Sequence, residues 1–336
     1  MRILLMAPSF FGYRERVAAE LAKMGHEVEV VDDRPSESTA FKSFAKVSYG
    51  LVDAKIDRYA KGLARRVAAS FYDRVIYMGG MSFCFTPAQF AEVRKVSRAR
   101  FTAYLWDSFE NCQRFAGCIN YFDEVLSFEP VDCQRYGLRF RPLFFDNCYA
   151  EISNEPNSGY EYDACFIGSV HQPSKYEAVL EISSGLEELG MRVFRHFYMP
   201  SRSAEFIRKA TRRSYRKGSF VTKGLSAGEV VDTYRKSKAV IDSPQSGQSG
   251  LTMRTLEVLG SNRKLITTNA DVANYDFYDP VNVFISSNGT VPPPAFFEEA
   301  FSPIPKSVIE QYSIQGFCRA LINQDDCKAE YRRETS

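Results

Sequence analysis

Short apolar runs alternate with amphipathic stretches along most of the chain. Residues 2–7 (Arg-Ile-Leu-Leu-Met-Ala) predict a buried parallel strand, residues 14–24 an amphipathic helix, and residues 27–32 a second strand after a Gly-His turn. Further strand-like runs cover residues 74–78, 101–106 and 124–128. This alternation predicts an open α/β sheet whose functional loops follow the carboxyl ends of the strands.

The same alternation starts again after a polar stretch. Residues 154–159 (Asn-Glu-Pro-Asn-Ser-Gly) are rich in turn formers and predict a linker. Beyond it, strands are expected at residues 163–168, 192–197, 239–242 and 264–268, and helices at 174–189 and 227–236. The fold class predicted is therefore α/β, with two Rossmann-like domains, residues 1–150 and 160–304, facing each other across a cleft.

Length and composition fit this organisation and exclude several classes. A chain of 336 residues with 45% apolar residues has room for two ordinary domains. A net charge of +2 argues against general nucleic-acid binding, and no apolar run is long enough to span a bilayer, which leads us to expect a cytoplasmic protein. The eight cysteines lack Cys-x-x-Cys spacing and are expected to be reduced small hydrophobes.

One segment, residues 246–269, carries the clearest chemistry. Its glycines, Gly247 and Gly250, remove side-chain bulk where backbone amides must approach a ligand, and Ser249 or Thr252 can cap the helix that follows. Arg254 and Glu257 are three apart and share a helix face. A carboxylate there can accept two hydrogen bonds from a ribose while the guanidinium binds a diphosphate. The alternative is a capped surface helix with an ordinary ion pair.

The run Gly-Leu-Thr-Met-Arg-Thr-Leu-Glu-Val-Leu-Gly followed by Lys-Leu-Ile-Thr-Thr-Asn resembles the C-terminal nucleotide-sugar motif of bacterial GT-B glycosyltransferases. The similarity is to those of capsule and lipopolysaccharide biosynthesis, including CgeB-like proteins and group 1 glycosyltransferases. Further matches lie at residues 104–108, 121–125, 162–169, 175–176 and 275–280. The resemblance implies sugar transfer from a nucleotide-sugar donor to a polysaccharide or lipid-linked oligosaccharide, without a cofactor, and a closing helix over residues 305–325 that returns to the first domain.

Three further positions are assigned to donor binding. Gly168 and Ser169 follow a predicted strand, so their backbone amides can reach the donor diphosphate. Lys223 lies where GT-B enzymes often place a loop that holds the base or the diphosphate. The alternatives are a plain strand-to-helix turn for the first pair and an exposed surface lysine for the third. Arg254 is assigned a catalytic role on the departing diphosphate.

Asp107 is the candidate general base, because it follows Tyr-Leu-Trp at a strand end and its apolar neighbours should raise its pKa. The alternative is that it caps the next helix. The first loop is expected to meet the acceptor through Phe10, Phe11, Tyr13 and Arg14; the alternative is a hydrophobic loop that covers the sheet edge. Asp32 and Asp33 follow the second predicted strand, where a nicotinamide enzyme has its ribose-binding acid. The loop after the first strand, residues 7–14, has one glycine where the dinucleotide-binding turn needs three, which argues against that class of enzyme.

No metal is expected, because Asp32-Asp33 and Asp325-Asp326 do not form an Asp-x-Asp motif and a helix N-terminus with Arg or Lys can stabilise the diphosphate instead. The basic run from Arg208 to Lys217 is either a solvated helix or a patch for anionic lipid, which would give peripheral contact with the inner face of the membrane. Two rival functions remain: a nucleotide-sugar epimerase of the same fold, and an inactive module that binds only nucleotide or a partner protein.

Overall fold

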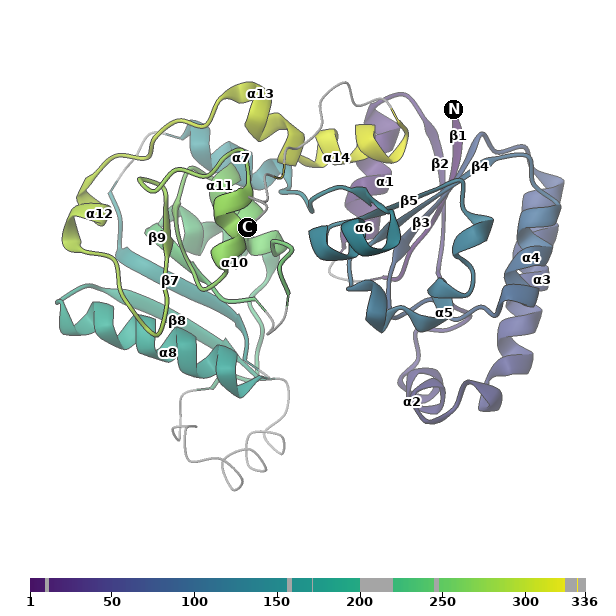
Figure 1. Ribbon diagram of the computed structural model, residues 1–336, viewed down its shortest axis with the longest axis horizontal. Coiled ribbons are helices and arrows are strands. Elements are labelled where there is room, and N and C mark those ends of the chain that lie inside the picture. The colour runs from purple at the N-terminus through teal and green to yellow at the C-terminus, as the bar shows by residue number, and fades with distance from the viewer. Residues whose placement is uncertain are drawn as a thin grey trace. The chain divides into compact units, whose positions relative to one another are not determined.

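The computed structural model describes residues 1–9, 12–155, 159–170, 172–199, 220–244, 248–323 and 331. The chain divides into two compact units (Figure 1). Unit 1 contains residues 1–143 and the segment that begins at Ile314, and unit 2 contains Phe144–Ser313 with Tyr331. Among the described residues, no helix is both long and apolar enough to cross a bilayer.

Unit 1 is built on a parallel sheet, for which the described residues supply six strands in the order β2-β1-β3-β4-β5-β6. The strands are β1 (Arg2–Met6), β2 (Glu27–Val31), β3 (Arg74–Gly79), β4 (Arg100–Leu105), β5 (Glu124–Ser127) and β6 (Arg139–Phe140). The helices are α1 (Tyr13–Lys23), α2 (Thr39–Val47), α3 (Asp53–Ala69), α4 (Pro87–Lys95), α5 (Gln113–Ala116), α6 (Pro130–Tyr136) and α14 (Ile314–Leu321), with short 3-10 turns η1 (Tyr49–Leu51), η2 (Phe109–Asn111) and η3 (Ile119–Tyr121).

Aromatic side chains fill the core on one face of this sheet. Phe83, Phe90 and Phe115 are fully buried and meet one another edge to face or through Tyr77, with ring centroids 5.1–5.6 Å apart. Helices α3 and α4 run side by side over this core (Figure 1). The C-terminal helix α14 packs against α1, where the Cys318 thiol lies 3.9 Å from the Val17 carbonyl oxygen.

Unit 2 repeats the same architecture with a second parallel sheet, in which the described strands have the order β11-β10-β9-β7-β8. The strands are β7 (Tyr162–Ser169), β8 (Val193–Tyr198), β9 (Ser237–Asp242), β10 (Lys264–Thr267) and β11 (Val283–Ile285). The helices are α7 (Asn147–Asn154), α8 (Pro173–Glu188), α10 (Ala227–Arg235), α11 (Met253–Gly260), α12 (Pro294–Glu298) and α13 (Lys306–Ile309), with 3-10 turns η4 (Ala270–Asn274) and η5 (Glu310–Tyr312).

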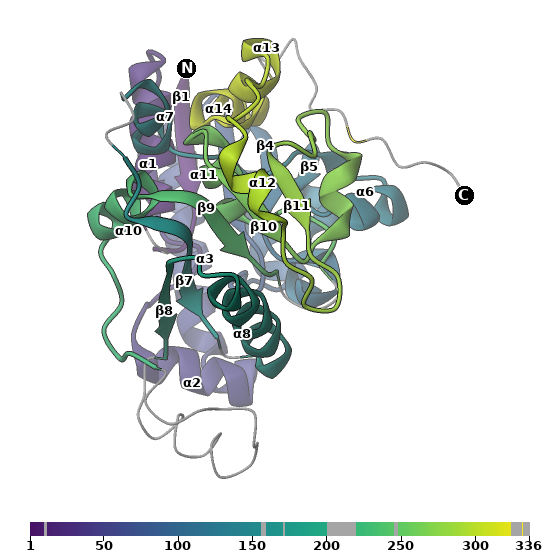
Figure 2. The same cartoon turned by 90° about the vertical axis from the view of Figure 1, so that its left-hand side faces the viewer.

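The connections in unit 2 place helices on both faces of the sheet. The chain moves outward from β7 to β8 through α8 and back across β7 to β9 through α10, so right-handed crossovers put these helices on opposite faces (Figure 2). Helix α11 follows β9 and therefore begins at the carboxyl edge of the sheet. The doubly wound α/β architecture predicted from the sequence is confirmed in both units.

Candidate functional site

The carboxyl edge of the second sheet brings together a buried acid and two basic side chains. Asp242 ends β9 and is 1% exposed at its side chain. Arg254, in the first turn of α11, donates from Nη1 to Asp242 over 2.8 Å and from Nη2 to the carbonyl oxygen of Ile167 over 2.5 Å. Its guanidinium also lies 5.2 Å from the Phe166 ring centroid. Arg254 is thus fixed to the ends of two neighbouring strands.

Asp242 also orders the start of α11. Thr252 is the N-cap residue: its hydroxyl accepts a hydrogen bond from the Thr255 amide over 3.3 Å and donates to Asp242 over 2.6 Å. The Thr255 hydroxyl donates to the same carboxylate over 2.9 Å. Three donors therefore converge on one buried carboxylate. They hold the N-terminal end of the helix, with its partial positive charge, at the sheet edge.

The electrostatics of this cluster favour an added anion. Burial alone would raise the pKa of Asp242, but the charges of Arg254 and Lys175 lower it, so the carboxylate is ionised. Burial and, to a smaller extent, the charge of Arg254 lower the pKa of Lys175 to about 8, while Asp242 acts in the opposite direction. Arg254 and Lys175 therefore lie around Asp242 beside the first turns of α8 and α11, and Glu257 is a second acid whose charge acts on Arg254. The partial positive charge of the two helix N-termini would stabilise an anion bound at this place.

Gly168 is necessary for this arrangement. A Cβ atom at Gly168 would lie 2.7 Å from Arg254 Nη2 and 3.2 Å from Phe166 Cζ, so only glycine lets the guanidinium lie against the end of β7. The next residue, Ser169, has a buried hydroxyl with no hydrogen-bond partner among the described residues. A buried hydroxyl without a partner is unusual and is satisfied when a ligand oxygen approaches.

Of the other residues predicted to bind the donor, Gly250 and Glu257 lie at or near α11, and Lys223 does not. Glu257 lies one turn after Arg254, is 9% exposed, and adds to the charges that raise the pKa of Arg254 against the lowering effect of burial. Gly250 is buried before the helix, and its carbonyl oxygen accepts a bond from Gln248 over 2.8 Å. Lys223 is exposed between β8 and α10, where its carbonyl oxygen lies 3.0 Å from His196 Nε2. The structure brings Gly168, Thr252, Arg254 and Glu257 to one helix start, whereas Lys223 lies on a separate stretch of the chain.

A cavity of about 440 Å³ opens beside this edge. It is lined by α8 and by the residues that follow β10 and β11. Glu177 and Glu181, one turn apart on α8, line one side, and Thr268 and Ser286 belong to the strand ends. Carboxylates and hydroxyls around a space of this size suit a ligand that is rich in hydroxyl groups. This cavity could not be predicted from the sequence, because its lining comes from three segments that lie far apart in the chain.

In unit 1, Asp107 follows β4 and accepts a hydrogen bond from the Met81 amide over 3.0 Å. This donor belongs to the turn after β3, so the carboxylate bridges two strand ends; it does not cap η2, whose N-cap residue is Ser108. A Cβ atom at Gly80 would overlap the Asp107 carboxylate, which explains the glycine there. Burial raises the pKa of Asp107, and the Met81 amide partly offsets the shift.

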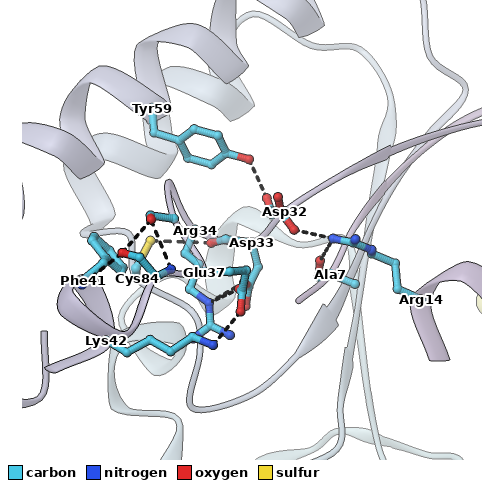
Figure 3. A network of polar contacts seen from close by, with 12 residues as sticks. Ala7, Arg14, Asp32, Asp33, Arg34, Glu37, Phe41, Lys42, Tyr59 and Cys84 are labelled. Atoms are coloured by element: carbon cyan, nitrogen blue, oxygen red, sulfur yellow. Dashed lines mark hydrogen bonds and ion pairs between the residues drawn. The ribbon is translucent and has the colours of Figure 1, made fainter. Parts of the chain in front are cut away.

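Ion pairs surround the carboxyl end of β2, at the residues that follow the strand (Figure 3). Arg14 donates to the Asp32 carboxylate and, over 3.1 Å, to the Ala7 carbonyl oxygen, so Asp32 already has a cationic partner where a nicotinamide enzyme would need it for a ribose. Asp33 is fully buried, neither of its carboxylate oxygens has a hydrogen-bond partner among the described residues, and Arg34 Nε lies 3.5 Å away. Burial raises the pKa of Asp33 to about 6.

Several predicted features lie outside the described residues. They are Phe10 and Phe11 in the first loop, the basic run from Arg208 to Lys217, and the pair Asp325-Asp326. Among the residues that are described, no group of three or more His, Cys, Asp or Glu side chains is placed to hold a metal ion.

Comparison with known proteins defines the fold. No family model and no curated protein matches the chain by sequence. Among solved structures, the lipopolysaccharide outer core galactosyltransferase WaaB is 16% identical, with a TM-score of 0.55 over 97% of this chain and 100% of that one. A glycosyltransferase from Rickettsia africae is 13% identical, with a TM-score of 0.61 over 96% and 97%. A UDP-GlcNAc 2-epimerase from Neisseria meningitidis, bound to UDP-GlcNAc, is 8% identical, with a TM-score of 0.53 over 96% and 99%. The chain has the GT-B fold.

Proposed function

We propose that this protein transfers a sugar from a nucleotide-sugar donor to a polysaccharide or lipid-linked oligosaccharide acceptor, and that unit 2 binds the donor. The observation that carries the proposal is the placement of Arg254 and Lys175 around the buried Asp242 at the first turns of α8 and α11. Two basic side chains beside two helix N-termini suit a diphosphate. The GT-B fold supports the same conclusion at the level of architecture.

The donor-binding roles follow from the contacts in unit 2. Arg254 uses two N–H groups to hold Asp242 and Ile167, which leaves the others for diphosphate oxygens. Glu257, one turn further along α11, would accept hydrogen bonds from the ribose. Backbone amides at Gly168, Ser169 and Gly250 would approach the phosphates. Thr252 would act indirectly, because its hydroxyl already orders the helix start.

The proposed reaction needs a proton acceptor and a stabilised leaving group. An acceptor hydroxyl would attack the anomeric carbon, Asp107 would take the hydroxyl proton, and the bond from that carbon to the diphosphate oxygen would break. The nucleoside diphosphate would leave with the electron pair. Arg254 and Lys175 would stabilise the negative charge that develops on it. No step in this scheme requires a metal ion.

A specific observation also favours a second candidate. The similar structures include an epimerase, which shares the fold and carries a bound nucleotide sugar. An enzyme of that kind would convert the donor without an acceptor saccharide. An inactive module, the third reading, would bind nucleotide and release no sugar.

A thermal-shift panel of nucleoside diphosphates and nucleotide sugars tests the proposal on the full chain. A ligand at one hundred times its Kd adds about 2.7 kcal/mol to the free energy of unfolding, which is readily measured. We expect one base to stabilise the wild type, and Glu257→Ala to reduce that stabilisation. The proposal is wrong if no nucleotide stabilises the wild type.

A further inference from the structure

Three large apolar side chains lie exposed together on unit 1. Phe44 and Val47, on α2, are 54% and 80% exposed, and Leu51, in the adjoining turn η1, is 64% exposed. Phe44 and Val47 are three residues apart and share one face of the helix. We call these three residues the α2 surface. Single exposed apolar residues are ordinary, but three within eight positions of one helix and turn form a cluster.

The adjoining face of α2, which carries Phe41, attaches the helix to the unit. Phe41 is buried, with the Lys55 ammonium 5.5 Å from its ring centroid, and the Ser38 hydroxyl caps the helix by accepting from the Phe41 amide. Lys42 pairs with Glu37 over 2.7 Å, and Glu37 pairs with Arg34 over 2.5 Å (Figure 3). The helix is therefore held by its inner face, and its outer apolar face is presented to solvent.

The charges around the α2 surface are positive. Residues 38–51 contain two charged side chains, Lys42 and Lys46, and Lys46 is exposed with no ion pair among the described residues. Lys55 and Arg58, in the first turns of α3, are exposed as well. Of the nearby acids, Glu37 pairs with Lys42 and Asp57 pairs with Lys61, while Asp53 accepts a bond from the neutral Gln89 side chain and keeps its charge. Lys46, Lys55 and Arg58 outnumber this one acid. Apolar side chains flanked by cations match an anionic lipid surface.

The α2 surface also lies at the functional end of unit 1. Helix α2 follows β2, and α3 then returns along the sheet to the start of β3, so α2 lies beyond the carboxyl edge. Figure 1 shows α2 at the end of this unit opposite the N-terminus. Asp107 lies at the same edge. We infer that the α2 surface docks the protein on anionic bilayers, which would bring this edge to the headgroups where a lipid-linked acceptor lies.

Vesicle flotation of the full chain tests this inference. The vesicles are phosphatidylcholine alone and phosphatidylcholine mixed with phosphatidylglycerol. The wild type should float with the mixed vesicles. The double variant Phe44→Ser/Val47→Ser should lower the partition coefficient by about tenfold or more, because two apolar side chains no longer enter the interface. Lys46→Ser should lower it by about fivefold on the mixed vesicles alone, since each basic residue contributes about 1 kcal/mol near an anionic surface.

A matched control comes from the same unit. Phe71, just after α3, is 72% exposed and lies apart from the α2 surface in sequence, so Phe71→Ser removes a similar apolar area without touching the cluster. That variant should float like the wild type. All variants should keep the wild-type unfolding temperature and nucleotide affinity, which separates this test from that of the proposed transfer reaction.

Four results would overturn the inference. The first is that the wild type fails to float with the mixed vesicles, and the second is that Phe44→Ser/Val47→Ser floats as well as the wild type. The third is that flotation is lost in Arg212→Ser/Arg213→Ser, in the basic run, and not in the α2 variants. The fourth is that vesicle binding is absent and analytical ultracentrifugation shows a dimer that Phe44→Ser/Val47→Ser dissociates, in which case the surface pairs with a second copy.

Discussion

Substituting Gly168 by alanine should damage both the fold of unit 2 and its binding of nucleotide. The new Cβ would lie 2.7 Å from Arg254 Nη2, about 0.7 Å inside the ordinary contact limit. The guanidinium cannot yield freely, because Asp242 and the Ile167 carbonyl oxygen hold it on two sides. We expect loss of the bond to Ile167, which costs about 1.5–3 kcal/mol for a charged donor. The lower chain entropy of alanine recovers about 0.5–1 kcal/mol.

The net loss in stability is therefore about 0.5–2.5 kcal/mol, or a few degrees in Tm. Calorimetry should also show nucleoside diphosphate affinity reduced about tenfold or more, since Arg254 no longer faces the phosphates correctly. Gly228→Ala is the matched control: Gly228 lies in the first turn of α10 with no atom within 4 Å of an added Cβ, and the change should not destabilise. Unchanged stability and unchanged affinity in Gly168→Ala would refute the reasoning.

Four further predictions concern individual groups. Glu257→Ala should weaken nucleotide binding about ten- to a hundredfold while folding survives; unchanged affinity by calorimetry would remove the ribose assignment. Asp107→Asn should lower turnover about a hundredfold at constant donor affinity, and wild-type turnover should fall as pH drops through the raised pKa of Asp107; near-normal turnover in the variant would make Asp107 structural. Excess chelator should leave the rate intact, whereas loss restored by magnesium or manganese would contradict metal independence. The pKa of Asp33 is about 6 in the folded state and near 3.8 in the unfolded state, so between these pH values the folded state binds more protons. The free energy of unfolding therefore falls as pH rises through that window. Asp33→Asn should remove that loss, up to about 3 kcal/mol at pH 7, and urea unfolding showing the same pH slope in both proteins would contradict it.

Local pattern was sufficient to predict most of the fold. Short, mainly apolar runs such as residues 2–7 and 239–242 form β1 and β9. Parallel strands that are covered on both faces have apolar side chains on both sides, so such runs could be recognised without an alternation of polar and apolar residues. The two shortest strands, β6 and β11, were missed because two or three residues carry no readable period. The predicted closing helix is divided into α13, η5 and α14: α13 continues directly into η5, and Ser313, in an extended conformation, separates η5 from α14.

The candidate site was only partly predictable. Arg254 and Glu257 could be proposed from the sequence because their spacing sets them on one helix face and the segment resembles a nucleotide-sugar motif; their roles stay predictions. Asp242 was missed as a site residue: it ends an ordinary buried strand, and its role depends on Thr252, Thr255 and Arg254 folding back over it. Only the tertiary structure shows that this acid holds the arginine in place.

The expected domain boundary near residue 150 also differs from the division in the structure. Residues from Phe144 onward, including α7, belong to unit 2. Tyr149 of α7 packs against Tyr234 of α10, with ring centroids 5.6 Å apart. Such a contact joins segments more than eighty residues apart, so the composition of the linker at residues 154–159 could not locate the boundary.

The most direct test of the central claim is phosphorus NMR of a nucleotide sugar incubated with the wild-type chain and a saccharide acceptor. The nucleotide sugar is the one that the thermal-shift panel identifies. The proposed transfer breaks the bond between the anomeric carbon and the diphosphate, so the resonances of the free nucleoside diphosphate should grow in, and Arg254→Lys should slow them markedly. An epimerase that only interconverts donor sugars would leave the diphosphate linked to sugar. If the donor stays esterified in the presence of acceptor, the protein does not catalyse glycosyl transfer to that acceptor and the account is contradicted.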